Sequence, residues 1–174
     1  MPLDIKPTDW RKAKSAVLAY GKARNVFRMK QECLQRSGLL NGNDNKVGVA
    51  GEFWAKVLYH RLGYRLTSIE PSNNKDFDFC CRHDRRELKI SVKVISDESK
   101  AGKQMRLHTS AEWDELLVLL LTEELKPYRY GRVTQEQFQQ AKKDEAICEQ
   151  PKVSRSWLEH KGWITRYGKV QNWD

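Results

Sequence analysis

Long apolar runs, paired cysteines and internal repeats are all missing from this sequence of 174 residues. No apolar stretch approaches the roughly 20 residues that a membrane-spanning helix needs, so we expect no membrane partner. The opening stretch, MPLDIKPTDW, has no apolar signal-peptide core. The four cysteines (Cys33, Cys80, Cys81 and Cys148) form no CxxC pair and have no zinc-ligand spacing. We therefore expect a cytoplasmic protein with reduced cysteines and no zinc site.

Positive charge, in contrast, is plentiful. The chain has 32 Lys and Arg residues against 23 Asp and Glu, a formal net charge of +9, and its pI is near 9.4. Such an excess suits a polyanionic partner without specifying which one. The length favours a single domain over residues 1–174. Within it we distinguish an N-terminal helical part (1–47), a core (48–143) and a basic, aromatic C-terminal extension (144–174).

The expected elements alternate between helices and strands. Helical spacing of apolar residues predicts helices over 8–36 and 48–62, the second ended by Gly63, and a strand follows over 64–69. The unbroken apolar run 116–121 is typical of a strand buried on both faces. Residues 126–133 form a shorter, edge-type strand, after which Thr134 caps a polar helix. This order predicts an α/β fold in which helices flank a mixed central β-sheet.

Residues 75–96, KDFDFCCRHDRRELKISVKVIS, have the pattern of a β-hairpin. Alternation along a strand places Asp76 and Asp78 on one face, with Phe77 and Phe79 on the other. On the return strand, Leu88, Ile90, Val92 and Val94 share the apolar face, and Glu87, Lys89, Ser91 and Lys93 the polar one. Carboxylates beside a lysine near a sheet centre suit one chemistry in particular. Acidic oxygens hold Mg²⁺, and the lysine orients or activates the water that attacks a phosphodiester.

These residues resemble the PD-(D/E)xK phosphodiesterase superfamily, which has a restriction-endonuclease-like core. The resemblance covers about residues 48–122 and is closest to small type II restriction or defence nucleases. It implies that Glu52 is the helix carboxylate, Asp76 or Asp78 the hairpin aspartate and Lys93 the motif lysine. The implied metal ligands are Asp76, Asp78 and Glu52, holding Mg²⁺, for which Mn²⁺ substitutes.

The sequence departs from the family pattern at Ser91, where an acidic residue is usual. Either Glu87 and Lys89 form the motif further along the strand, or Ser91 occupies the motif position and a backbone carbonyl completes the metal site. Pairing Asp78 with Ser91 centres the turn at Asp84–Arg85, within the polar segment, which favours the second alternative. In that case Asp76, Asp78, Ser91 and Lys93 lie on one face. We expect the helix over 48–62 to lie against that face, with Glu52 directed at it and with Phe53 and Val57 packed into the core.

The resemblance implies a metal-dependent endonuclease, a phosphodiester hydrolase that binds and cuts DNA, works as a homodimer and belongs to a restriction system with a cognate methyltransferase encoded alongside. Two other functions remain open: a DNA-binding module that has lost catalysis at Ser91, and a nuclease directed at RNA. Basic residues of two segments are the candidates for nucleic-acid contact: Lys100, Lys103, Arg106, Arg155, Lys161 and Arg166. The aromatic residues beside Arg155, Lys161 and Arg166 have two possible roles: they contact nucleic acid, or they pack in the core.

Overall fold

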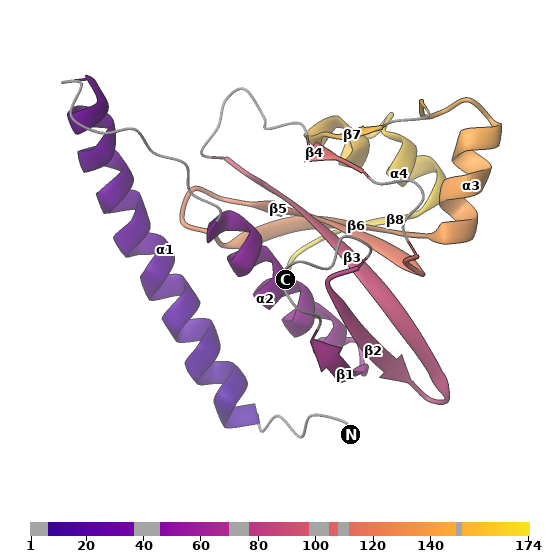
Figure 1. The fold of residues 1–174 in the computed structure, drawn as a ribbon, viewed down its shortest axis with the longest axis horizontal. Coiled ribbons are helices and arrows are strands. Elements are labelled where there is room, and N and C mark those ends of the chain that lie inside the picture. Colours follow the sequence, from indigo (N-terminus) through magenta and orange to yellow (C-terminus); the bar gives the residue numbers. More distant parts are fainter. Residues whose placement is uncertain (1–6, 37–45, 70–76, 98–104, 108–111, 149–150) are drawn as a thin grey trace.

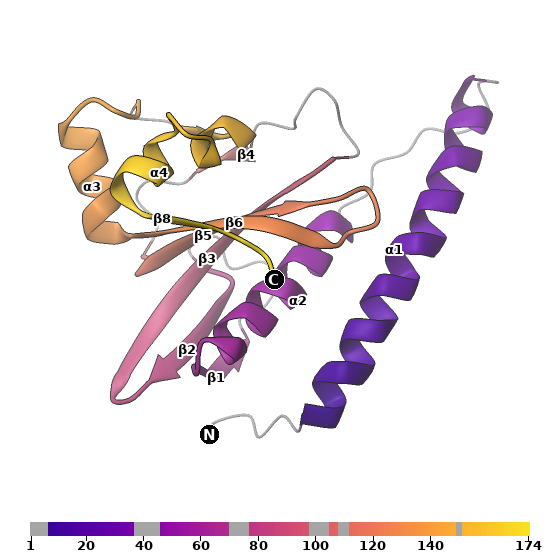
Figure 2. The same ribbon diagram turned by 180° about the vertical axis from the view of Figure 1, so that it is seen from behind.

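The computed structural model describes residues 7–36, 46–69, 77–97, 105–107, 112–148 and 151–174. A six-stranded mixed sheet lies at its centre, with helices packed on both faces (Figures 1 and 2). The strand order across this sheet is β1-β2-β3-β5-β6-β8, and only the central β3–β5 pair is parallel. The predicted α/β class with a mixed sheet flanked by helices is confirmed.

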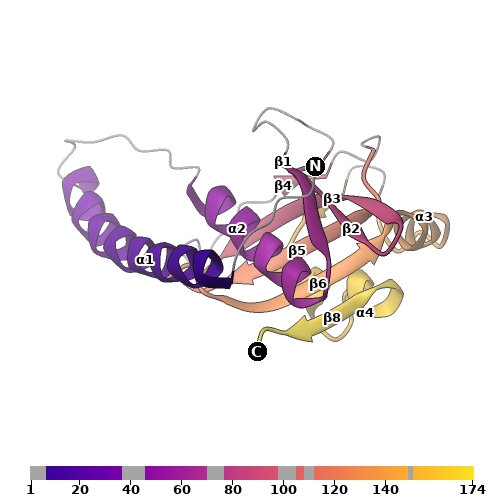
Figure 3. The same ribbon diagram turned by 90° about the horizontal axis from the view of Figure 1, so that it is seen from below.

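Two helices cover one face of the sheet. They are α1 (Pro7–Arg36) and α2 (Lys46–Arg61), and both lie close to their predicted limits. Gly63 ends the second helix as predicted: its φ of 86° is left-handed, and its N–H donates to the carbonyl of His60. Figure 3 shows α1 running along the outer side of α2, at the edge of the molecule.

The hairpin consists of β2 (Phe79–His83) and β3 (Arg86–Ser96). His83 pairs with Arg86, so the turn lies at Asp84–Arg85, as the polar segment predicted. The predicted common face of Phe77 and Phe79 is wrong. Phe79 lies in the core under α2. Phe77 precedes the strand, so the alternation of strand side chains does not apply to it, and it packs on the opposite side of the sheet.

The strand next to β3 is β5 (Glu115–Leu121), and every residue of it is buried, as expected for the apolar run. It pairs on its other side with β6 (Pro127–Thr134). The prediction that this strand lies at the edge is wrong, because β8 (Lys169–Asn172) pairs with it and takes the edge position. β1 (Arg65–Ile69) forms the opposite edge.

The C-terminal third covers the second face. It contains α3 (Gln135–Lys143), η1 (Arg155–Leu158), α4 (Trp163–Tyr167) and β7 (Lys152–Val153). β7 forms a small two-stranded sheet with β4 (Met105–Arg106), which comes from earlier in the chain. Thr134 caps α3 through a complete capping box, as predicted. Among the helices of the described residues, none is both long and apolar enough to cross a membrane.

Candidate active site

Asp78 lies where the hairpin opens. Its backbone N–H donates to the carbonyl of Ile90, and its carboxylate accepts the N–H of Val92 at 2.6 Å. Strand pairing between β2 and β3 ends one residue later in β2, at Phe79 and Ile90. The side chain of Asp78 thus takes the place of a partner strand at this edge of β3. That hydrogen bond fixes the carboxylate beside the sheet.

Glu52 comes from α2, which lies unusually close to β3. A Cβ added to the neighbouring Gly51 would lie 2.0 Å from a methyl carbon of Val94, so glycine is what allows this approach. Phe53 and Val57 pack against the core under the sheet, as predicted. The Glu52 side chain is 39% exposed, at the flank of the helix.

The predicted face for α2 is wrong. The helix packs on the side of β3 that contains Ile90, Val92 and Val94. Because strand side chains alternate, Ser91 and Lys93 project to the opposite side, together with Ile95 of the second core. The helix packs on this side because Ile90, Val92 and Val94 bury more apolar area against it than Ser91 and Lys93 could.

Glu52 nevertheless interacts electrostatically with both Asp78 and Lys93. Burial, followed by the negative charge of Asp78, raises the pKa of the Glu52 carboxyl, while Lys56 and Lys93 pull it down. Charged groups of three elements therefore influence one another: those of α2, of the segment before β2, and of β3. Asp78 lies at the edge of β3 beyond its pairing with β2, and Lys93 lies further along the same strand.

Lys56 is a site residue that the sequence analysis missed. Its ammonium lies 3.8 Å from the Glu52 carboxylate and 5.8 Å from the centre of the Phe79 ring, and its side chain is only 14% exposed. The signal was available, because residues four apart on a helix lie on the same side. It went unnoticed because Lys56 belongs to no motif of the resembling family.

The donor set suits a hard divalent cation. Mg²⁺ is usually held by one or two carboxylates together with water and substrate phosphate oxygens, and Glu52 and Asp78 supply two carboxylates. Burial and, after it, repulsion by Asp78 raise the pKa of Glu52, and a cation between the two carboxylates would relieve the repulsion. Asp76, the third predicted ligand, lies outside the described residues. Within the described part of the chain, no group of three or more His, Cys, Asp or Glu side chains could hold a metal.

The alternative motif of Glu87 and Lys89 has other contacts. Glu87 pairs with Arg82 at 3.7 Å, and Lys89 pairs with Glu112 at 3.1 Å. The hydrogen bond that Lys89 donates to Glu112 is the largest influence on the pKa of Lys89 and raises it. Both residues lie nearer the hairpin turn than Asp78, so the structure does not bring them to its carboxylate. Ser91 is buried, with 4% of its surface exposed.

The candidates for nucleic-acid contact separate into two groups. Lys100 and Lys103 lie outside the described residues, and Arg106 belongs to β4, of which only the backbone is described. Arg155 forms an ion pair with Asp97 at 2.5 Å, which ties η1 to the end of β3. An arginine in such a pair is less available for a phosphate than a free one.

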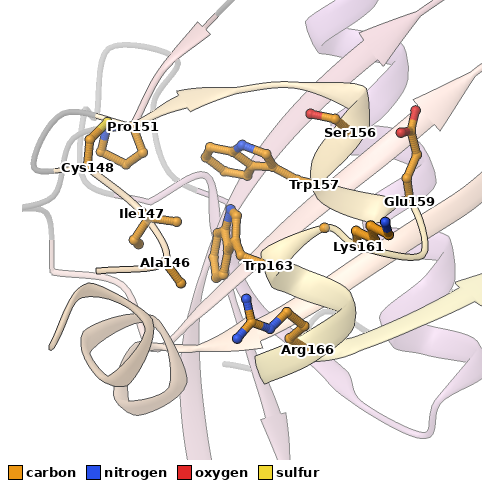
Figure 4. A pocket seen from close by; sticks show the side chains of 11 residues that line it. Ala146, Ile147, Cys148, Pro151, Ser156, Trp157, Glu159, Lys161, Trp163 and Arg166 are labelled. Carbon is orange, nitrogen blue, oxygen red and sulfur yellow. The ribbon is translucent and has the colours of Figure 1, made fainter. Parts of the chain in front are cut away.

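Lys161 and Arg166 are exposed at the rim of a pocket of about 420 Å³ (Figure 4). Two tryptophans form its walls: Trp157 and Trp163 meet edge to face with ring centres 5.0 Å apart. Both are largely buried in the second core. The aromatic residues of the extension therefore complete the core, which was the second of the two roles left open for them.

A buried polar network was also missed by the sequence analysis. Glu115 accepts hydrogen bonds from the Tyr59 hydroxyl and from Arg132, whose Nε and Nη2 lie 2.5 and 3.0 Å from its two carboxylate oxygens. Burial, and then Glu115, raises the pKa of Tyr59. The same two causes raise the pKa of Cys81 to about 12, so that thiol is inert at neutral pH. The network joins α2, β5 and β6 beneath the hairpin.

Comparison with known proteins gives little further guidance. No protein-family model matches the chain, and no curated protein matches its sequence. The solved structure of a bacterial homing endonuclease, I-Ssp6803I, is similar to 73% of this chain and 89% of that one, with 14% sequence identity and a TM-score of 0.45. So distant a likeness decides neither family nor activity.

Proposed function

We propose that the protein is a metal-dependent endonuclease that hydrolyses phosphodiester bonds in DNA. The observation that supports this most strongly is that Asp78, fixed at the open edge of β3 by the N–H of Val92, and Lys93 of the same strand both act electrostatically on the carboxyl of Glu52. Two carboxylates and a lysine beside the same strand edge form the minimal set for metal-assisted phosphodiester hydrolysis.

Each side chain has a distinct part in this proposal. Glu52 and Asp78 would hold the cation, and Asp78 would keep a fixed orientation through the N–H of Val92. A bound Mg²⁺ would polarise a phosphoryl oxygen and lower the pKa of its water. Lys93 would donate hydrogen bonds to the attacking water or to the phosphate. Lys56 would balance the charge of Glu52 when no cation is present.

The net charge of +9 agrees with a nucleic-acid substrate. We place the protein among restriction-type enzymes, in which two copies cut the two strands of a duplex, alongside a cognate methyltransferase. A single chain offers one candidate site, so double-strand cleavage calls for a homodimer. An RNA-directed activity would be recognised by digestion of RNA in preference to DNA under the same conditions.

Cleavage of supercoiled plasmid in Mg²⁺ or Mn²⁺, with EDTA as the blank, tests this proposal. We expect Lys93→Ala to lower the cleavage rate by about 100-fold or more, because it removes a group that acts at the reacting phosphate. Lys89→Ala is the matched control: this lysine lies on the same strand and face but pairs with Glu112. Loss of cleavage in the Lys89 variant alone would instead favour the alternative motif. If duplex, single-stranded and methylated DNA all remain intact in every reaction, the proposed nuclease activity is refuted.

One observation favours a second function, a DNA-binding module without catalysis. Ser91 is neutral and buried where the resembling family has a carboxylate, which leaves fewer ligands for a metal. A binding module would retain salt-sensitive DNA binding and show no metal-dependent cleavage. Replacing Ser91 with Asp separates the two functions. A gain of cleavage would identify a weakened site, whereas loss of existing cleavage would mean that serine belongs there.

A further inference from the structure

The positive charge of the chain is concentrated in its first helix. Residues 7–36 contain eight Lys and Arg against two Asp and Glu, a net charge of +6. The whole chain has +9, so the remaining 144 residues together contribute only +3. One helix thus provides two-thirds of the excess charge, although none of the residues implied by the family resemblance lies in it.

The apolar side of α1 is packed against the rest of the protein over the first half of the helix. Trp10 contacts Phe53 and His60 of α2, with ring centres 6.0 and 5.2 Å apart. Val17 and Leu18 pack against the core under the sheet. At Gly21 the helix touches the turn between β5 and β6 so closely that a Cβ would lie 2.1 Å from the carbonyl oxygen of Glu124. The helix is therefore anchored along one side.

The other side of α1 presents basic groups between small residues. Arg11, Lys12 and Lys22 are all exposed on this side. Lys14 is also exposed, but it lies four residues from both Trp10 and Leu18 and so belongs to the packed side. Within the described residues, no ion pair engages Arg11, Lys12 or Lys14. The other exposed positions over residues 11–23 are Tyr20 and four small residues, Ser15, Ala16, Ala19 and Ala23, whose short side chains allow a surface to approach the helix. Such a face suits a long polyanion better than a compact ligand.

We propose that α1 is an arm that holds duplex DNA by its phosphate backbone, outside the cleavage site. A helix of 30 residues is about 45 Å long, and a duplex presents one negative charge per ~1.7 Å of its axis, so several contacts fit along the arm. Glu52 directly precedes Phe53, which contacts α1, so the arm and the candidate site lie on adjacent sides of α2. The choice of DNA rests on the proposed function.

An anionic membrane is the other surface that attracts basic helices. Such helices bind lipid by burying an apolar face in the headgroup region. In the first half of α1 that face is already packed against α2 and the core, through Trp10, Val17 and Leu18. Further along, Val26 and Met29 are exposed, but two such side chains form no continuous apolar face. The charged side alone would lie on a membrane without insertion. The observations therefore favour nucleic acid.

DNA binding measured in EDTA, where no cleavage occurs, tests the arm separately from the enzyme. The arm variant replaces Arg11, Lys12 and Lys22 with Gln. The control variant replaces three lysines elsewhere, Lys142, Lys143 and Lys169, and changes the net charge equally. Affinity for a duplex of ~30 base pairs is measured by fluorescence anisotropy between 50 and 300 mM salt, and melting curves establish that both variants fold.

We expect the arm variant to bind about 10-fold or more weakly near 150 mM salt. Each lost phosphate contact lowers the slope of log K against log salt by about 0.9, so the slope should fall by ~2 to 3. The control should stay within about threefold of the wild type. Equal losses of affinity in both variants would mean that net charge alone governs binding, and this would overturn the proposal. Arm-dependent binding to phosphatidylserine vesicles without binding to DNA would also overturn it. If the arm variant binds DNA more weakly but the protein never cleaves DNA, the proposal for α1 is supported and only the proposed nuclease activity is refuted.

Discussion

The carboxylate of Asp78 accepts the backbone N–H of Val92 at 2.6 Å, so a side chain finishes the hydrogen bonding of β3 where β2 departs. The same carboxylate raises the pKa of Glu52 on the neighbouring helix, after the larger effect of burial. Asp78 therefore has two separable roles: it completes a strand edge, and it contributes charge to the candidate site.

Two substitutions of Asp78 separate these roles. The side-chain oxygen of asparagine still accepts a hydrogen bond, so Asp78→Asn should leave the free energy of unfolding without metal unchanged or slightly raised. Asp78→Ala leaves the Val92 N–H unpaired, which should cost about 1 kcal/mol. Urea denaturation in EDTA measures both. Equal stability of the two variants would show that this hydrogen bond has no structural importance.

The raised pKa of Glu52 predicts a pH-dependent effect of Glu52→Gln. A carboxyl whose pKa is higher in the folded than in the unfolded state destabilises the fold as pH rises from its unfolded value of 4.5 through its folded value. Glutamine does not ionise, so the variant has no such destabilisation at high pH. Without divalent cations, the variant should therefore melt at a higher temperature than the wild type at pH 7, and the difference should vanish below about pH 4.5. A difference that does not change with pH would contradict this origin.

The hairpin turn, the buried strand and the end of α2 at Gly63 were predictable because each has a local cause: a polar tetrapeptide, an apolar run and a left-handed glycine. The side of β3 that α2 covers was not predictable in the same way. Alternation tells which residues share a face, but the face that receives a helix depends on the summed area of residues distant in the chain. For the same reason Arg155 could not be paired with Asp97 from sequence, since 58 residues separate them.

The Glu115–Arg132 pair is another contact of this kind, and its burial makes it sensitive. The side chains are 9% and 16% exposed, respectively. Glu115→Ala leaves the guanidinium without its partner, and we expect a loss of about 3 kcal/mol or more in the free energy of unfolding. The exposed Arg82–Glu87 pair is the control, where Glu87→Ala should cost under about 1 kcal/mol. Similar costs for the two alanine variants would show that the buried network is dispensable.

The position of a bound metal tests the account most directly. A crystal soaked in Mn²⁺ gives an anomalous difference map in which the ion is located independently of any cleavage assay. We predict a peak within about 2.0–2.6 Å of carboxylate oxygens of both Glu52 and Asp78, which is lost in Asp78→Asn crystals soaked identically. The absence of a peak between these carboxylates, with the ion bound elsewhere or nowhere, would contradict the proposed metal site and remove the main support for the nuclease.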